Sequence, residues 1–298
     1  MLRMNVRFLV CVVAMFGGSF GCALTAQAQS APAHGLWVWK STMVLAQNRA
    51  AETLRDFCRA NGVNEVYVSV PSQPDAAQLG RLAHVIDVLH RSNIRVEALL
   101  ESENADEPGK HRDKLLDHVR AIVEFNRAHP QYKFDGVHLD IEPQQRPENK
   151  GPGNLRFLPG LVDAYRDARK IAEAGGMTIN ADIQNKLLKG DLNERRTLMT
   201  ALPRLTLMLY EVSSAGDGDT LEQRKEKLRA ASAKFLAMAY DGLPASGAAT
   251  MTIGLRTPDY GDQLPAMLAS LDKENGAYRH YAGWARHAYN DVLGAAAN

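Results

Sequence analysis

The chain has 298 residues and is 45% hydrophobic, which is enough for a sizeable core and typical in length of one α/β barrel. Its 35 Lys and Arg residues nearly balance its 34 Asp and Glu residues. This balance argues against a nucleic-acid or membrane-surface partner that is bound through bulk charge.

The first 28 residues have the pattern of a secretory signal peptide. Arg3 and Arg7 precede an apolar stretch over residues 8–24, which three glycines interrupt. Residues 26–28 (Ala-Gln-Ala) provide the small-x-small pattern that a signal peptidase reads. The apolar stretch is short and glycine-rich for a membrane span, which favours cleavage.

Cleavage predicts a mature protein that starts near Gln29 and lies in the periplasm or is secreted, without stable membrane insertion. Residues 29–298 would then form one domain. The alternative is processing as a lipoprotein at Cys22, which the lack of an aliphatic residue three positions before this cysteine disfavours.

Strand-like and helix-like runs alternate along the mature chain. The strand-like runs cover 35–39, 65–70, 95–101, 134–142, 177–183, 206–212, 250–256 and 278–287. The helical runs cover 50–61, 76–92, 110–129, 154–174, 193–202, 219–240 and 262–274. Strands that alternate with helices run parallel, because each crossover needs about a dozen residues or more.

Eight such units predict a single closed (β/α)₈ barrel, a TIM barrel. An open doubly wound sheet is the structural alternative. No Gly-x-Gly-x-x-Gly follows the first predicted strand, which removes the main dinucleotide-binding version of that fold.

The fourth predicted strand, 134–142 (FDGVHLDIE), carries charged side chains in an apolar setting. Side chains alternate between the two faces of a strand, so His138, Asp140 and Glu142 share one face. Barrel active sites lie at the C-terminal ends of the strands, which places Glu142 nearest to them. An inward row of charges is costly unless it is paired or hydrated, so it indicates either a structural ion-pair network or a functional site. Three polar groups that rise to the strand end favour a site.

The segment 135–142 (DGVHLDIE) resembles the DGxDxDxE signature on the fourth strand of family 18 glycoside hydrolases, the chitinase-like barrels. The resemblance implies that Glu142 is the general acid and that Asp140 orients the substrate's acetamido group or tunes the acid. Asp135 matches the first Asp of the motif. His138 stands where the family has its middle Asp, and Pro143 follows Glu142 directly, so the chain resembles a divergent relative.

Two further segments resemble the same family. Residues 208–211 (MLYE) are similar to the Met-x-Tyr-Asp of the sixth strand, which implies that Tyr210 contacts the reacting sugar and that Glu211 replaces the Asp. Residues 281–289 (YAGWARHAY) are similar to the eighth strand, which implies that Trp284 is the aromatic floor of the sugar subsite.

Hydrolysis of a glycosidic bond needs a carboxylic acid that protonates the leaving oxygen, and a nucleophile or base. The second group is either another carboxylate or the acetamido group of the substrate. Asp140 supplies the like charge that raises the pKa of Glu142. Candidate partners at other strand ends are Glu101, Asp182 and Glu211, and flat surfaces for sugars come from strand aromatics, namely Trp37, Trp39, Tyr67, Tyr210, Trp284 and Tyr289.

The site predicted from these arguments has two parts. The catalytic candidates are Glu142, Asp140 and Glu211, and the substrate-binding candidates are Asp135, His138, Tyr210, Asp182, Trp284, Glu101 and Trp39. The expected function is that of an exported glycoside hydrolase that acts on a carbohydrate without a metal or other cofactor. The oligomeric state is left open.

Two other functions are open. Carboxylates such as Asp140, Glu142, Asp182 and Glu101 could hold Ca²⁺ or Mg²⁺ for phosphodiester chemistry, but no His-x-His or His-Glu-x-x-His motif accompanies them. A barrel that binds glycan without cleaving it is the second alternative, and such a binder gains little from a carboxylic acid at a strand end.

Overall fold

Eight parallel strands pair in chain order, and β8 pairs with β1, so the sheet closes into a barrel. The structure is a computed structural model and describes residues 31–151, 153–210, 219–244 and 246–296. The strands are β1 (Ala33–Val38), β2 (Glu65–Ser69), β3 (Arg95–Ser102), β4 (Gly136–Ile141), β5 (Thr178–Gln184), β6 (Arg204–Met208), β7 (Thr250–Arg256) and β8 (Tyr281–His287). The predicted (β/α)₈ barrel is confirmed.

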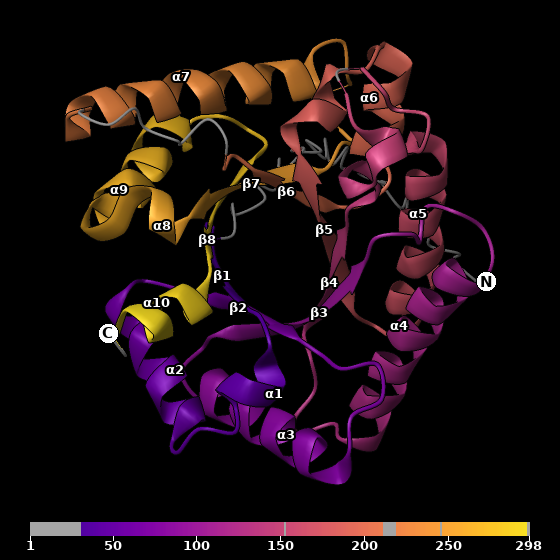
Figure 1. The fold of residues 1–298 in the computed structure, drawn as a ribbon, viewed down its shortest axis with the longest axis vertical. Helices are drawn as coiled ribbons and strands as arrows, with labels where there is room; N and C mark the ends of the chain where they lie inside the picture. Colours follow the sequence, from indigo (N-terminus) through magenta and orange to yellow (C-terminus); the bar gives the residue numbers. More distant parts are fainter. Residues whose placement is uncertain (1–30, 152, 211–218, 245, 297–298) are drawn as a thin grey trace, which may run out of the picture. The chain divides into compact units, whose positions relative to one another are not determined.

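Helices surround the strands (Figure 1). Those between successive strands are α2 (Ala50–Ala60), α3 (Ala76–His90), α4 (Lys110–Ala128), α5 (Leu158–Ala174), α6 (Leu192–Met199), α7 (Leu221–Tyr240) and α9 (Leu264–Asn275). Short helices follow the ends of three strands: α1 (Ser41–Val44), α8 (Thr257–Tyr260) and α10 (Tyr289–Ala296). The sequence pattern did not predict these short helices, because each is too brief to show a helical period.

The outer face of the barrel is apolar, as the alternation along the strands requires. Val137, Leu139 and Ile141 of β4 are each at most 1% exposed and belong to the core between strands and helices. Burial of each such side chain contributes roughly 1.5–3 kcal/mol. Side-chain caps mark several helix starts, such as Asp75, which accepts a hydrogen bond from the backbone N–H of Gln78.

The interior of the barrel holds a small hydrophobic cluster, comprising Trp37, Tyr67, Leu99, Ala285 and Ala288, between two polar ends. Gly35 makes room for it, because a Cβ at that position would lie 2.8 Å from Cζ of Tyr67. The register places His138 beside Leu99 and Asn180, and Asp140 beside Glu101. These pairings bring the inward residues of β4 together with those of β3 and β5.

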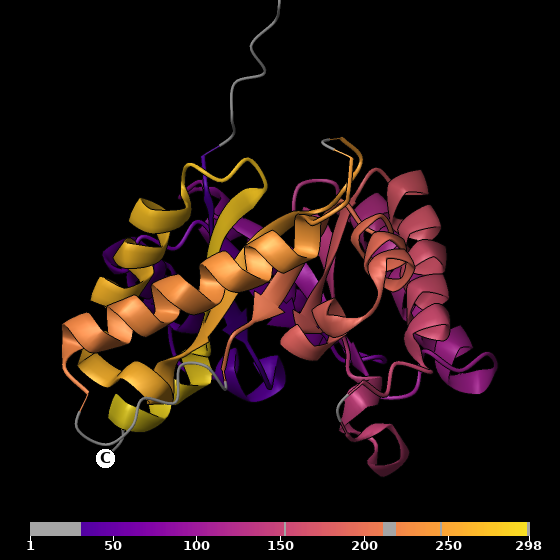
Figure 2. The ribbon, with the colours of Figure 1, turned by 90° about the horizontal axis from the view of Figure 1, so that it is seen from above.

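A distinctive connection follows β4. It contains two 3₁₀ turns, η1 (Pro143–Gln145) and η2 (Pro147–Asn149), before α5 begins. Figure 2 shows this segment, in magenta, projecting beyond the ends of the strands. The segment therefore lies where the active site of a barrel is expected.

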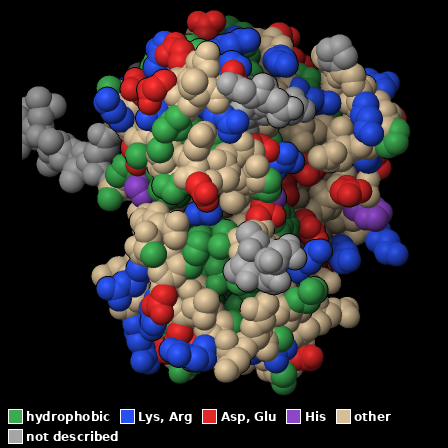
Figure 3. All heavy atoms as spheres, turned by 60° about the vertical axis from the view of Figure 1, so that its left-hand side comes forward, with side chains coloured by type: hydrophobic (Ala, Val, Ile, Leu, Met, Phe, Trp, Pro, Cys, Tyr) green, Lys and Arg blue, Asp and Glu red, His purple; other side chains and the backbone are tan. Residues whose placement is uncertain are grey.

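The predicted signal peptide, its cleavage site near Gln29 and the alternative Cys22 lie outside the described residues. None of the described helices is both long enough and apolar enough to cross a membrane. Basic and acidic side chains are interspersed on the face that Figure 3 presents.

Candidate active site

A cleft with a volume of about 420 Å³ opens where the strands end. It is lined by Trp37, Trp39, Glu101, Asp140, Glu142, Gln145, Asp182, Gln184, Met208, Tyr210 and His287. The structure thus brings together several side chains from the predicted site, namely Glu142, Asp140, Tyr210, Asp182, Glu101 and Trp39.

Glu142 is the first residue after β4, and its carboxylate is held by three amide groups. Nε2 of Gln184 donates to Oε1 at 2.9 Å, and Nε2 of Gln144 donates to the same oxygen at 3.1 Å. Nε2 of Gln145 lies 3.3 Å from Oε2 and 3.4 Å from Oε1. Pro143 begins the 3₁₀ turn that brings the two neighbouring glutamines back over the carboxylate. The proline that departs from the family motif therefore shapes the surroundings of the acid.

The carboxyl groups of β4 have raised pKa values. Burial raises the pKa of Glu142 and the negative charge of Asp182 adds to this, while hydrogen bonds from the glutamines oppose it. Burial, followed by the charges of Asp182 and Glu142, raises the pKa of Asp140 well above its usual range, against the opposing charge of His138. Oδ1 of Asp140 has no hydrogen-bond partner among the described residues. Two carboxyl groups with raised pKa values thus lie next to each other at the end of β4.

Asp182 of β5 is 2% exposed, and both of its carboxylate oxygens accept hydrogen bonds. Nε1 of Trp37 donates to Oδ2 at 2.9 Å, and Nε2 of His138 lies 2.8 Å from Oδ1. The hydroxyl of Tyr165 donates to the backbone carbonyl of Asp182 at 3.2 Å. Contacts from β1 and β4 therefore fix this side chain, and a contact from α5 fixes its backbone.

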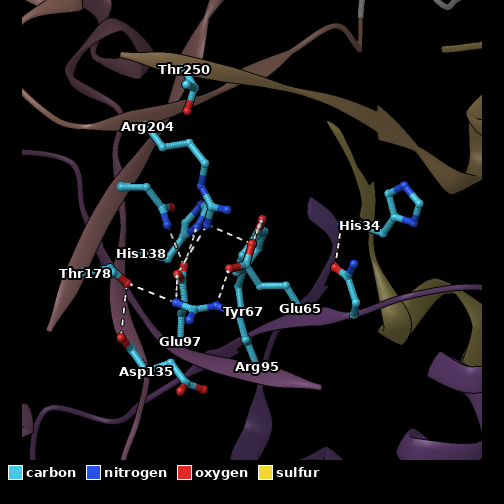
Figure 4. A network of polar contacts seen from close by, with 12 residues as sticks. His34, Glu65, Tyr67, Arg95, Glu97, Asp135, His138, Thr178, Arg204 and Thr250 are labelled. Atoms are coloured by element: carbon cyan, nitrogen blue, oxygen red, sulfur yellow. Dashed lines mark hydrogen bonds and ion pairs between the residues drawn. The ribbon is translucent and has the colours of Figure 1, made fainter. Parts of the chain in front are cut away.

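His138 lies beneath the cleft and is completely buried. Its Nδ1 is 3.6 Å from Oε2 of Glu97, and its ring stacks on Tyr67 with centroids 3.9 Å apart (Figure 4). Burial lowers the pKa of His138, but the carboxylates of Asp182 and Glu97 outweigh this effect and raise it to about 9. His138 is not among the residues that line the cleft, but it pairs with one of them, Asp182, and its charge also acts on Asp140.

Asp135 requires a correction, because it lies at the opposite end of β4. It accepts a hydrogen bond from the backbone N–H of Val96 at 2.8 Å and pairs with His90 at 2.9 Å. It lies seven positions before Glu142, and a strand rises about 3.3 Å per residue, so it is roughly 23 Å from the carboxylate in the cleft. It fixes the start of β4 and is not in reach of a substrate in the cleft.

Trp284 requires a second correction, because it points out of the barrel. Its Nε1 donates to Oδ2 of Asp272 at 3.1 Å, and its ring stacks on His34 at 4.2 Å. The alternation along β8 turns Gly283, Ala285 and His287 inward instead. Glu211, the third catalytic candidate, lies outside the described residues.

Other residues of the cleft were not predicted as site residues. Gln184 could have been found, because alternation along β5 puts it on the same face as Asp182. His287 ends β8, and Nε1 of Trp39 donates to its Nε2 at 3.0 Å. Burial lowers the pKa of His287, so its ring is neutral near pH 7. The role of Trp37 as a donor to Asp182 depends on contacts across the barrel, which the sequence does not show.

Among the described residues, no group of three or more His, Cys, Asp or Glu side chains is arranged to hold a metal ion. The oxygens of Asp182 and Glu142 already accept hydrogen bonds from N–H groups. These donors compete for the lone pairs that a divalent cation would need.

No protein-family model and no curated protein sequence matches the chain. Solved structures of similar fold include a chitinase from Chromobacterium violaceum, with 12% identity, a TM-score of 0.50, and coverage of 87% of this chain and 94% of that chain. The PgaB (BpsB) glycoside hydrolase domain from Bordetella bronchiseptica has 12% identity and a TM-score of 0.50, over 88% of this chain and 95% of that chain. Cellulose synthase subunit Z from Clostridioides difficile has 14% identity and a TM-score of 0.52, over 86% and 91%. At these identities the similarity establishes a shared barrel fold.

Proposed function

We propose that the protein is a glycoside hydrolase that cleaves a polysaccharide or glycan with Glu142 as its general acid. The observation that carries the proposal is the setting of Glu142: at the end of β4, in the cleft, with a raised pKa and a second carboxyl group next to it. Two of the structures with a similar barrel are described as a chitinase and a glycoside hydrolase domain, which supports the same reaction class.

In this reaction Glu142 gives its proton to the glycosidic oxygen while the bond from the anomeric carbon to that oxygen breaks. The bonding electron pair goes to the oxygen, and positive charge develops on the anomeric carbon. A water molecule then bonds to that carbon, and its proton returns to the carboxylate of Glu142. Trp39 and Tyr210 supply aromatic surfaces on the walls of the cleft for the sugar rings.

The decisive experiment compares Glu142→Gln with the wild type on polymers of N-acetylhexosamine and of neutral sugars. The variant keeps the shape of the side chain but has no proton to donate, so turnover should fall by ~10²–10⁴-fold. Glu124→Gln is the matched control, because Glu124 is 66% exposed on α4 and lies outside the cleft.

Three results would contradict the proposal. Undiminished turnover by Glu142→Gln would remove the general acid. Loss of activity in a chelator, with recovery in Ca²⁺ or Mg²⁺, would favour the metal-dependent phosphodiesterase. Glycan binding that is never followed by product release would favour a non-catalytic binding barrel.

We also propose that the chain is exported and cleaved after Ala28, on the evidence of its first 28 residues. Mass spectrometry of the processed protein should find an N-terminus near Gln29. A lipid on Cys22 would contradict this route.

A further inference from the structure

We propose that Asp182 is the permanent negative charge of the cleft and that, held by His138 as a positioning residue, it keeps protons on the neighbouring carboxyl groups of Asp140 and Glu142. This inference rests on the proposed function and extends it. The resemblance in sequence gives the tuning role to Asp140, whereas the contacts in the barrel give it to a residue on the next strand.

The contacts of Asp182 are those of an ionised carboxylate. The indole N–H of Trp37 can only donate, so Oδ2 must accept at 2.9 Å. Oδ1 faces Nε2 of His138 at 2.8 Å, the distance of a charge-assisted hydrogen bond. If the carboxyl group of Asp182 were protonated, its own hydrogen would face an N–H hydrogen of Trp37 or of protonated His138. The arrangement therefore favours the carboxylate anion.

His138 is suited to be the matching cation. A carboxylate lies near each of its ring nitrogens: Asp182 at 2.8 Å from Nε2 and Glu97 at 3.6 Å from Nδ1. Only the imidazolium form has a proton on both nitrogens to offer. The ring is 0% exposed, so bulk solvent does not reach it.

Glu97 remains an anion for reasons of its own. Nδ2 of Asn180 donates to its Oε2 at 2.6 Å, and Nη2 of Arg204 lies 3.2 Å from its Oε1. Although burial acts to raise the pKa of Glu97, the charges of Arg204 and His138 lower it to about 2. The positive charge of His138 is therefore shared between two fixed anions, one below it and one at the cleft.

The fixed charge of Asp182 acts directly on the pair at the end of β4. Ionisation of Asp140 or Glu142 would place a second negative charge beside it in a partly buried site, which is unfavourable. After burial, the charge of Asp182 is the largest cause that raises the pKa of Asp140. The other titratable or charged groups that face this set are His138 and Glu101 near Asp140, and Tyr67, Tyr165, Tyr210 and His287 around Asp182.

The test compares two isosteric variants, Asp182→Asn and Asp140→Asn, in the pH dependence of kcat/KM. A general acid must be protonated, so activity falls as the pH rises through its pKa. Asp182→Asn removes a negative charge, lowers that pKa and should move the alkaline limb to lower pH by about one unit. Asp140→Asn replaces a group that is already neutral, so it should reduce the rate and leave the limb in place. Asp182→Glu, which retains the charge, should restore the limb.

The opposite pattern, a limb that moves in Asp140→Asn and stays in Asp182→Asn, would overturn the inference. A loss of packing alone would lower the rate of both variants and move neither limb, and this outcome would also overturn it.

A second measurement needs no substrate. Nitrogen-15 NMR of the wild-type imidazoles should show His138 still protonated on both nitrogens at pH 8, and Asp182→Asn should lower the pH at which it loses a proton. If His138 titrates near its ordinary value in the wild type, the inference fails even when the enzyme is active. If no glycan is cleaved but His138 titrates as expected, the proposed function fails and the charge arrangement stands.

Discussion

Acidic side chains lie at both ends of the barrel interior, but they are paired with arginines at one end only. At the start of the strands Glu65 and Glu97 face Arg95 and Arg204 (Figure 4). At the other end carboxylates gather in the cleft, and no Lys or Arg belongs to the described residues that line it. The matched end forms a structural network in which Arg204 opposes the effect of burial, although burial still raises the pKa of Glu65. The unmatched end has two carboxyl groups with raised pKa values and no basic partner, which is the setting that general acid catalysis requires.

At the matched end the charged groups are in direct contact. Nη2 of Arg204 lies 2.7 Å from Oε2 of Glu65 and 3.2 Å from Oε1 of Glu97. The side chains of these two glutamates are only 2% and 1% exposed. The hydroxyl of Tyr67 also donates to Oε2 of Glu65 at 3.0 Å. Such groups lose much hydration on folding, so each depends on its partner.

The largest difference between the two ends should appear when one charge is removed from each. Arg204→Met takes the closer of the two shared arginines away from two buried carboxylates, so the free energy of unfolding should fall by about 3–5 kcal/mol. Glu142→Gln removes a carboxyl group that has no basic partner. It should change the free energy of unfolding by less than about 1 kcal/mol, while turnover is lost. Urea unfolding of both variants measures the contrast. Equal destabilisation by the two changes would make the cleft carboxylates a structural network as well.

His138 lies between the two ends and should link stability to pH. Its pKa in the folded protein is about 9, above the ordinary value of about 6.5, so folding favours its protonated form. The resulting stability is fully present below about pH 6.5 and is lost as the pH rises through about 9, and it amounts to at most about 3 kcal/mol. The free energy of unfolding from pH 6 to pH 10 should therefore fall more steeply in the wild type than in His138→Gln. Parallel curves would show that His138 is neutral in the folded state.

The fold was predictable because it depends on local periodicity. Runs such as 250–256 alternate over a length that admits only a strand, and β7 has those bounds. The same alternation put Asp140 and Glu142 on one face of the fourth strand, and both side chains line the cleft.

Contacts between strands were not predictable. Asp182 and His138 are 44 positions apart, and their pairing depends on the register of β4 and β5. The error on Trp284 has a similar cause. Trp284 was assigned from the resemblance of 281–289 to an eighth strand, whereas the face of β8 that turns inward is fixed by its pairing with β1 and β7. Asp135 was misplaced because its motif match was read as a binding role, although its position seven residues before Glu142 already puts it at the opposite end of the strand.

The smallest effect concerns the charge of the substrate. The lining of the cleft includes Glu101, which is exposed, and the anion of Asp182, with no basic side chain from the lining residues to balance them. A polymer of uronic acids would bring further negative charge into this site, so it should be bound more weakly than an uncharged polymer of the same linkage, by roughly threefold to tenfold at low salt. Exposed charges are screened over about 8–10 Å at physiological ionic strength. The difference in affinity between the two polymers should therefore shrink as salt is added. Glu101→Gln removes one of these charges and should make the difference between the two polymers smaller. Its matched control is Glu103→Gln, just after the end of β3 and outside the cleft lining. Affinities measured at two salt concentrations would decide the matter: a preference for uronates at low salt would show that basic groups, and not these carboxylates, govern the approach to the cleft.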